Sequence, residues 1–423
     1  VSPDATATII YTFGTTGLPK GAELSHTALL HTGIAARTIV PLDHSDVFLS
    51  FLPLSHIIER VGGHYLPLTI GAHIVYSQGV TALKKEITGV RPTVFLSVPR
   101  VFEYIQEAVF DQLPKQPPLK QKMFHIAVGI GDKVAILHSR GKRPGPFLNI
   151  AYGIAKKLVL EKVRERVTGG RDRFFVSGGA PLNAVTAKFF NALGVCLLEG
   201  YGLTECPVIT LNRPGKSMPG TVGQVIPGME VKIAEDGEIL SRGPSRMRCY
   251  NGNPQATADA IDSDGWFHTG DIGNFDDMQR LRIVDRKKDI IVLANGKNVA
   301  PLPIEALLKS NPMIQEAVLI GDKQATISAL IIPNWDQIAA ALPELSISAK
   351  EPDAWLDNAD VKKLIRKQLD TVAGSLADFE RVKQFRLLAK PFSIEGGELT
   401  PTLKVKRKTV QEKYASLIAE MSK

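Results

Sequence analysis

Cysteine is scarce in this chain, with three residues, Cys196, Cys206 and Cys249, among 423. Their odd number and the absence of any C-x-x-C spacing exclude a disulfide framework and leave no zinc-binding motif. We therefore expect three buried, reduced thiols in a protein of the cytoplasm.

Long apolar runs and a secretory signal are missing too. No stretch approaches the roughly 18 uninterrupted apolar residues of a membrane-spanning helix, so we expect no such helix. The chain has no internal repeats, and its first residue is Val1 rather than Met. We therefore expect a processed or partial chain.

Charge of one sign is not gathered into one long block, although the formal net charge is +8. Local basic excesses occur at 115–122, 140–143 and 404–408. This balance suits an anionic partner such as a nucleotide, acyl-CoA or lipid, with a solvated basic surface as the alternative. Because no motif of a nucleic-acid-binding fold is present, we expect no nucleic-acid partner.

The first half of the chain alternates strand-like and helix-like segments. Residues 9–33 predict a strand, a Gly-rich turn and a helix, and further strand-like runs follow at 46–54, 72–77 and 92–99. Repeated strand and helix of this kind indicates an α/β domain with a parallel sheet covered by helices.

Two other sequence patterns follow along the chain. Residues 114–146 carry Pro at both ends around a helical pattern, which predicts a helical insertion, with contact to a membrane surface as the alternative. Beyond residue 205 the pattern is β-rich, and Asp236-Gly237 between alternating runs predicts a hairpin over 229–243.

The chain is longer than one hydrophobic core usually supports, so we expect two domains. The large α/β domain spans 1–284 and includes a β-rich subdomain at about 206–284. The charged stretch 285–289 is the predicted hinge, and 290–423 form a smaller α+β domain that moves.

The stretch "YTFGTTGLPKG" at 11–21 is rich in Thr and Gly and contains Lys20. Backbone N–H groups of a Gly-rich turn form a concave site for anions, and hydroxyls and a lysine add donors. It differs from the G-x-x-x-x-G-K-[ST] phosphate loop, because Gly21 follows Lys20. A plain surface turn is the alternative.

Five further motifs follow this loop in order along the chain. They are "SGGAPL" (177–182), "EGYGLTE" (199–205), "GWFHTGD" (265–271), "DRKKD" (285–289) and "TPTLKVKR" (400–407). Together the six resemble the adenylate-forming enzymes, and "LPLSHIIER" (52–60) with "VPRVFE" (98–103) resembles their long-chain fatty acyl-CoA synthetases.

The resemblance implies an ATP site. The matching positions are Thr12, Gly14, Thr15, Thr16 and Lys20 for the β- and γ-phosphates, and Gly178, Gly179, Ala180, Tyr201 and Gly202 for the adenine. Thr204 and Glu205 match the catalytic α-phosphate and Mg²⁺ positions. Asp271 matches the ribose ligand and Arg286 its neighbour, with a surface ion pair as the alternative for Arg286.

The C-terminal part supplies the remaining implied roles. Lys404 matches the catalytic lysine of adenylation, and Lys288 matches the hinge of a domain alternation, with a plain linker as its alternative. The loop facing the thiol channel contains Gly296, Lys297 and Asn298. His56 either lines the junction of acyl tunnel and nucleotide site or packs in the core.

The implied reaction joins a long-chain fatty acid to CoA through an acyl-adenylate, with ATP and CoA as co-substrates and Mg²⁺ as cofactor. The alternatives are a ligase that uses a carrier protein, one that stops at acyl-AMP, and a non-catalytic remnant that binds nucleotide or acyl groups. Peripheral membrane contact and a homodimer stay open.

Two features depart from the family pattern. Only eight residues precede Ile9, whereas family members usually have a long N-terminal portion before the phosphate loop, so we expect that portion to be lacking. Phe13 stands where the family normally has Ser or Thr. Loss of one phosphate-directed hydroxyl should weaken ATP binding or turnover, at about 1.5–3 kcal/mol.

Overall fold

The computed structural model describes residues 1–12, 19–79, 81–345, 347, 351–400 and 405–421. Two compact units make up the chain. The first comprises 1–269 with 273–283, and the second comprises 270–272 with 284–423. Each unit has its own hydrophobic core.

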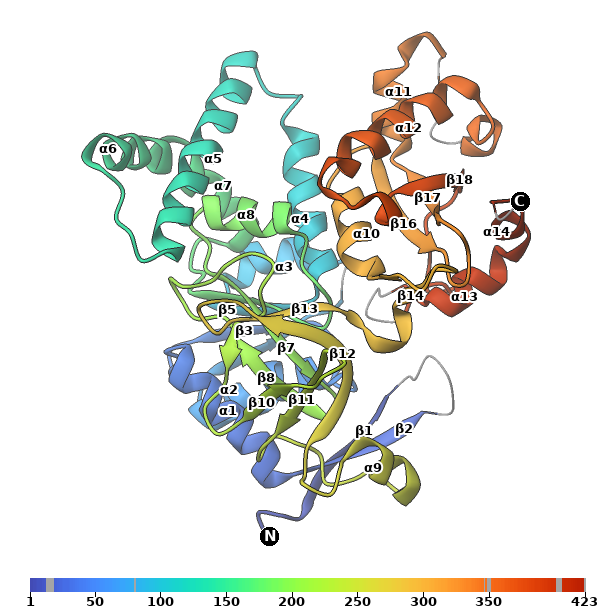
Figure 1. Ribbon diagram of the computed structural model, residues 1–423. Coiled ribbons are helices and arrows are strands. Elements are labelled where there is room, and N and C mark those ends of the chain that lie inside the picture. Colours follow the sequence, from blue (N-terminus) through green and yellow to red (C-terminus); the bar gives the residue numbers. More distant parts are fainter. Residues whose placement is uncertain (13–18, 80, 346, 348–350, 401–404, 422–423) are drawn as a thin grey trace. The chain divides into compact units, whose positions relative to one another are not determined.

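A seven-stranded sheet with the order β4-β3-β5-β6-β7-β8-β9 forms the centre of the first unit (Figure 1). The strands are β3 (Val47–Ser50), β4 (His73–Tyr76), β5 (Val94–Ser97), β6 (Phe174–Ser177), β7 (Leu197–Leu203), β8 (Cys206–Leu211) and β9 (Gln224–Val225). Strands β3 to β7 pair in parallel, so the predicted α/β class with a parallel sheet is confirmed.

Large apolar side chains explain why these strands lie inside the unit. Phe48, Phe95 and Phe175 are almost fully buried, and the rings of Phe95 and Phe175 lie 5.4 Å apart. Strands of a parallel sheet covered on both faces need such near-continuous apolar runs. Strand β3 ends at Ser50 rather than running on to residue 54, because Pro53 lacks the N–H that a sheet ladder needs.

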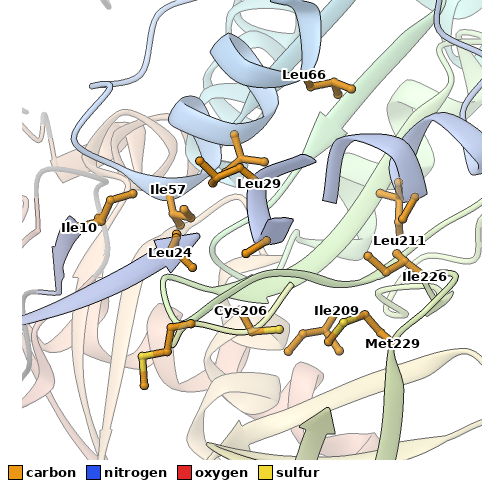
Figure 2. Close-up of a cluster of buried hydrophobic side chains, with 14 of the residues drawn as sticks. Ile10, Leu24, Leu29, Ile57, Leu66, Cys206, Ile209, Leu211, Ile226 and Met229 are labelled. Atoms are coloured by element: carbon orange, nitrogen blue, oxygen red, sulfur yellow. The ribbon is translucent and has the colours of Figure 1, made fainter. Parts of the chain in front are cut away.

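The N-terminal segment differs from its prediction. Instead of strand, turn and helix, β1 (Thr6–Thr12) and β2 (Lys20–Ser25) pair antiparallel as a hairpin, and α1 (His26–Ile39) follows directly. Lys20 and Gly21 therefore lie on a strand and not in a turn. The burial of Ala22 and Leu24 against the core explains this, and Figure 2 shows Leu24 near Leu29 of α1.

The helical region beginning at residue 114 is longer than predicted. It contains α5 (Pro118–Ser139), α6 (Pro146–Ala155), a π-helical stretch (Lys156–Leu160) and α7 (Glu161–Thr168). The Gly and Pro residues at 139–146 do not end the region. They separate α5 from α6, and Pro146 takes the first helical turn, where its missing N–H costs nothing.

The other helices of this unit are short or cover the sheet. They are α2 (Leu66–Ile70), α3 (Leu83–Val90), α4 (Pro99–Gln112), α8 (Ala184–Ala192) and α9 (Pro254–Ala260). A second sheet has the order β10-β11-β12-β13, with β10 (Glu230–Ile233), β11 (Glu238–Arg242), β12 (Phe267–Phe275) and β13 (Leu281–Arg286). The hairpin predicted at Asp236-Gly237 is confirmed, with Gly237 at a φ of 85°.

The second unit is an α+β fold around a three-stranded sheet of order β16-β17-β18. Its elements are β14 (Ile291–Val292), β15 (Asn298–Val299), α10 (Pro301–Lys309), β16 (Ile314–Ile320), β17 (Ile327–Pro333), α11 (Trp335–Ala341), α12 (Ala359–Val372), β18 (Val382–Leu387), α13 (Arg407–Lys413) and α14 (Ala415–Met421). Strand β17 is buried at every position, as a central strand requires.

Among the described residues, no helix is both long and apolar enough to cross a membrane. All three cysteines are free thiols. Only Cys206 is buried, so the prediction of three buried thiols was wrong for Cys196 and Cys249. Cys196 directly precedes β7 and lies near Asp172, and Cys249 lies in an irregular segment near Glu23.

Candidate functional site

The carboxyl ends of the central parallel strands carry polar residues. Ser97, Ser177 and Glu199 pair across β5, β6 and β7 at this edge. Strand β4 lies on one side of β3, and β5, the next strand in the chain, lies on the other side. The topological switch point of the sheet is therefore between β3 and β5 at this edge. Ligands of open α/β sheets bind at such edges.

Two of these groups are buried polar atoms with unusual surroundings. The Ser177 Oγ has no hydrogen-bond partner among the described residues. Burial raises the pKa of Glu199 to about 8, against backbone hydrogen bonds from Gly220 and Leu182 that favour the charged form. Glu199 stands in the motif "EGYGLTE", but nothing in the sequence pattern distinguishes it from a surface glutamate.

The predicted adenine residues lie along this edge and beyond it. Gly178 follows β6, and a side chain there would approach Ile58 and the Gly200 carbonyl only at ordinary contact distance. Gly179 has a φ of 83°, which favours glycine. At Gly202 a Cβ would lie 2.1 Å from the Pro207 carbonyl, so the tight β7–β8 pairing itself requires glycine there.

Glu205 forms the best-defined cluster of the site. Its Oε1 accepts a hydrogen bond of 2.6 Å from the Tyr250 hydroxyl, and both side chains are buried. Lys20 Nζ lies 5.1 Å from the centre of the Tyr250 ring. Burial, and then the charge of Glu205, raises the pKa of Tyr250 far above its usual range, so its hydroxyl stays a donor.

This cluster joins three distant segments. Tyr250 pairs with Ala22 of β2, the Asn251 N–H donates to the Gly21 carbonyl, and the Met247 N–H donates to the Glu205 carbonyl. A lysine thereby lies over the ring of the tyrosine whose hydroxyl donates to a buried carboxylate. A carboxylate offers about four lone-pair positions, so it can also bind a divalent cation.

The described part of the loop ends at Thr12 and resumes before Lys20. The Thr12 hydroxyl donates to the Lys20 carbonyl at 3.3 Å, which closes the hairpin across the loop. The predicted positions Gly14, Thr15 and Thr16, and also Phe13, lie outside the described residues. Thr204 forms the turn between β7 and β8 next to Glu205, and Ala180 follows Gly179 in an irregular segment.

His56 lies in the turn before a π-helical stretch, Glu59–Tyr65. It is half-buried, and its Nδ1 accepts the Ile58 N–H at 3.3 Å. One neighbour was missed in the sequence: Glu59 is 1% exposed, and neither carboxylate oxygen has a hydrogen-bond partner among the described residues. π-Helical turns often occur at functional sites.

The buried Glu59 carboxyl should make the stability of the fold depend on pH. Its burial raises its pKa from 4.5 to about 7. Because the folded protein binds this proton more tightly than the unfolded chain, protonated Glu59 contributes its full stability below the unfolded pKa. This contribution is lost as the pH rises through 7. We expect Glu59→Gln to remove about 3 kcal/mol of the pH dependence of urea unfolding between pH 4.5 and 7.

Exposed Glu235 is the control for this experiment, since Glu235→Gln should leave the pH dependence as in the wild type. Glu199 and Asp285 also have raised pKa values, so wild type and variants share their contribution. An unchanged slope in Glu59→Gln would show that the Glu59 carboxyl is solvated in the folded protein.

In the second unit, Asp271 and Arg286 form a pair. Asp271 is buried, and the Arg286 Nε lies 3.6 Å from its Oδ1. Lys288 lies in a short 3-10 turn, and burial and then the charge of Arg286 lower its pKa. Arg286 and Lys288 therefore lie in a basic segment near the buried carboxylate of Asp271.

The remaining predicted residues have mixed outcomes. Gly296, with a φ of 78°, lies in the turn between β14 and β15, and Asn298 pairs with Val292. Lys297 Nζ lies 4.4 Å from the centre of the Phe379 ring. Lys404 lies outside the described residues. In the part of the chain that is described, no group of three His, Cys, Asp or Glu residues could hold a metal ion.

Both units of the chain resemble known proteins in sequence and in fold. Residues 1–251 match the AMP-binding enzyme model, and residues 288–423 match the AMP-binding enzyme C-terminal domain. A similar solved structure is the adenylation domain of a carboxylate reductase from Mycobacterium chelonae, with a TM-score of 0.72 and 26% identity, over 99% of this chain and 60% of that one. ATP-bound MatB from Rhodopseudomonas palustris has a TM-score of 0.69 at 24% identity, over 99% and 70%.

Curated relatives are longer than this chain. A putative fatty-acid–CoA ligase, fadD11, from Mycobacterium tuberculosis is 36% identical over all of this chain and 74% of its own length. A long-chain-fatty-acid–CoA ligase, FadD15, from Mycobacterium bovis is 37% identical over 97% and 68%. The peroxisomal long chain acyl-CoA synthetase 6 of Arabidopsis thaliana is 34% identical over 100% and 61%. The chain therefore belongs to the AMP-binding, adenylate-forming enzyme family.

Proposed function

We propose that this protein activates a long-chain fatty acid with ATP and transfers the acyl group to CoA. The observation that carries the proposal is that Tyr250 contacts both Glu205 and Lys20, which stand at the positions of two of the family's nucleotide motifs. The names of the relatives at 34–37% identity support the fatty acid and CoA as substrates.

The reaction has two steps. In the first, a carboxylate oxygen of the fatty acid attacks the α-phosphorus of ATP, and pyrophosphate leaves with the electron pair of the broken P–O bond. In the second, the CoA thiolate sulfur attacks the acyl carbonyl carbon, and AMP leaves. The chain must neutralise negative charge that builds on the α-phosphate, for which preorganised donors are effective.

Glu205 is the residue that would hold Mg²⁺. Its donor set fits, because it is a buried carboxylate, and Mg²⁺ usually takes one or two carboxylates besides phosphate oxygens and water. When bound, the ion supplies positive charge to the phosphates. Tyr250 orients the carboxylate, Lys20 adds a fixed cation nearby, and Thr204 stands next to Glu205 for the α-phosphate.

The remaining predicted residues complete the proposal. Asp271 would accept hydrogen bonds from the ribose hydroxyls, and Arg286 would contact the ribose and phosphates. Gly178, Gly179, Ala180, Tyr201 and Gly202 would border the adenine, and His56 the acyl side. Lys404 would serve adenylation, and Lys288 would be the hinge that brings the loop of Gly296, Lys297 and Asn298 to the thiol in the second step.

Phe13 tests the phosphate loop directly. If a hydroxyl at this position contacts a phosphate, Phe13→Ser should raise the rate of ATP–pyrophosphate exchange at limiting ATP by about 10–100-fold, the equivalent of about 1.5–3 kcal/mol. Phe13→Ala separates the hydroxyl from the removal of the ring. Equal exchange by the Ser and Ala variants would show that the loop does not use the hydroxyl.

The acyl acceptor decides between the proposal and its enzymatic alternatives. Mass spectrometry of products from palmitate, ATP and Mg²⁺ with CoA, with a carrier protein, or with neither separates the three outcomes. We expect palmitoyl-CoA. Acyl-carrier product alone would show that the carrier protein is the acceptor. Acyl-AMP that CoA does not consume would show that the reaction stops at the acyl-adenylate.

A further inference from the structure

Helix α6 and the π-helical stretch that follows it expose an apolar stripe that their packing does not use. Phe147, Ile150, Ile154 and Leu158 follow one another at helical spacing and are 90%, 63%, 57% and 49% exposed. Residues three and four apart share one face of a helix, so these four side chains form a continuous surface. We call it the α6 stripe.

The opposite face of α6 already supplies what the core requires. Ala155 and Leu160 are buried in the core cluster that also contains Phe124 and Ala127 of α5, and Tyr152 packs partly against it. Figure 1 shows α6 beside α5, and their contact is within the first unit. A helix that is apolar on both sides is usually buried on both sides. The α6 stripe is therefore not explained by the folding of this unit.

The charge around the stripe is strongly basic. Residues 115–162 contain ten Lys and Arg against two Asp and Glu, so this segment carries the whole net charge of +8. Lys142 and Arg143 just precede α6 and Lys157 just follows it, and all three are exposed. They make no ion pair with any described residue. The rest of the chain is thus neutral in sum.

Charge also decides between two occupants of the stripe. A second copy of this chain would place one basic surface against the same basic surface, because a twofold contact uses identical patches. Like charges at such a contact are unfavourable. An anionic bilayer surface complements both properties, since its headgroups attract Lys and Arg and its interface takes up apolar side chains.

We propose that the α6 stripe and the basic residues beside it dock this protein onto anionic lipid bilayers. The helix lies along the membrane surface, with Phe147, Ile150 and Ile154 inserted between the headgroups and Lys142 and Arg143 against their phosphates. This inference is independent of the proposed enzymatic function, because the docking needs neither ATP nor an acyl substrate.

Vesicle co-sedimentation of the 423-residue chain tests the proposal. We expect binding to phosphatidylcholine vesicles that contain phosphatidylglycerol, weaker binding to pure phosphatidylcholine, and loss of the difference at high salt. Replacing Lys142 and Arg143 by Gln should lower binding to the anionic vesicles about twentyfold. The triple change Phe147→Ser, Ile150→Ser, Ile154→Ser should lower it about a hundredfold or more.

A matched control exists on α1. Ile34 is 63% exposed, as is Ile150, so Ile34→Ser changes the same amount of exposed apolar surface elsewhere. We expect Ile150→Ser to weaken vesicle binding and Ile34→Ser to leave it unchanged, with equal thermal midpoints. Three results would overturn the proposal: no vesicle binding by the wild type, equal binding by the triple variant, or a wild-type dimer in sedimentation velocity that the triple variant abolishes.

Discussion

Glu205→Gln is expected to lower fatty-acid-dependent ATP–pyrophosphate exchange about 10²–10³-fold, the usual cost of losing one preorganised electrostatic group. The amide keeps an oxygen that accepts the 2.6 Å hydrogen bond from Tyr250, so the fold should persist. It lacks the negative charge that a divalent cation requires. The variant should accordingly need more Mg²⁺ for half-maximal exchange.

Tyr250→Phe is the matched control for this prediction. It removes the hydrogen bond and keeps the carboxylate, so we expect a loss of stability of about 1.5–3 kcal/mol with most of the exchange retained. The Mg²⁺ requirement should stay near that of the wild type. If Glu205→Gln kept wild-type exchange and Mg²⁺ dependence, Glu205 would be a structural acceptor for Tyr250 only.

Asp271→Ala is expected to raise the apparent KM for ATP about a hundredfold. An ionised carboxylate accepts hydrogen bonds from both ribose hydroxyls, and each bond to a charged group contributes about 1.5–3 kcal/mol. Asp271 is buried beside Arg286, so the loss also leaves that guanidinium without the carboxylate at 3.6 Å. Initial rates at varied ATP and saturating fatty acid measure the effect.

A variant at Asp285 is the control that distinguishes an effect on nucleotide binding from an effect on stability. This neighbouring carboxylate is fully buried and accepts hydrogen bonds of 2.7 Å from the N–H groups of Leu302 and Arg286, so it holds α10 in place. Asp285→Asn should lower the thermal midpoint and leave the KM for ATP within about twofold. If both variants changed KM alike, the effect of Asp271→Ala would arise from the fold of this segment and not from ribose contact.

The fold followed from sequence where the pattern was local. Strand-like runs that alternate with helical segments predicted the parallel strands, and the Asp236-Gly237 turn predicted the hairpin, because each single strand and turn is specified by residues close together in the sequence. The N-terminal hairpin could not be predicted in this way. Gly21 and Lys20 are typical of turns, but pairing with β1 and the burial of Ala22 place them on a strand.

The site was predicted only in part, and the missing part is long-range. Tyr250 lies 45 residues from Glu205 and belongs to none of the six motifs, so only the fold shows that they are hydrogen-bonded. Glu59 lies within "LPLSHIIER", but its burial depends on the π-helical stretch that packs it inward. Likewise, the exposure of the α6 stripe depends on which face α5 covers.

Acyl-adenylate formation by this chain can be measured as the exchange of labelled pyrophosphate into ATP. The chain is incubated with ATP, Mg²⁺, labelled pyrophosphate and fatty acids of increasing length, with Glu205→Gln as the reference. We expect label in ATP only when a fatty acid is present, with more label for longer fatty acids, and acyl-AMP in the mixture. Exchange that is independent of fatty acid, or no greater than that of Glu205→Gln, would contradict this expectation.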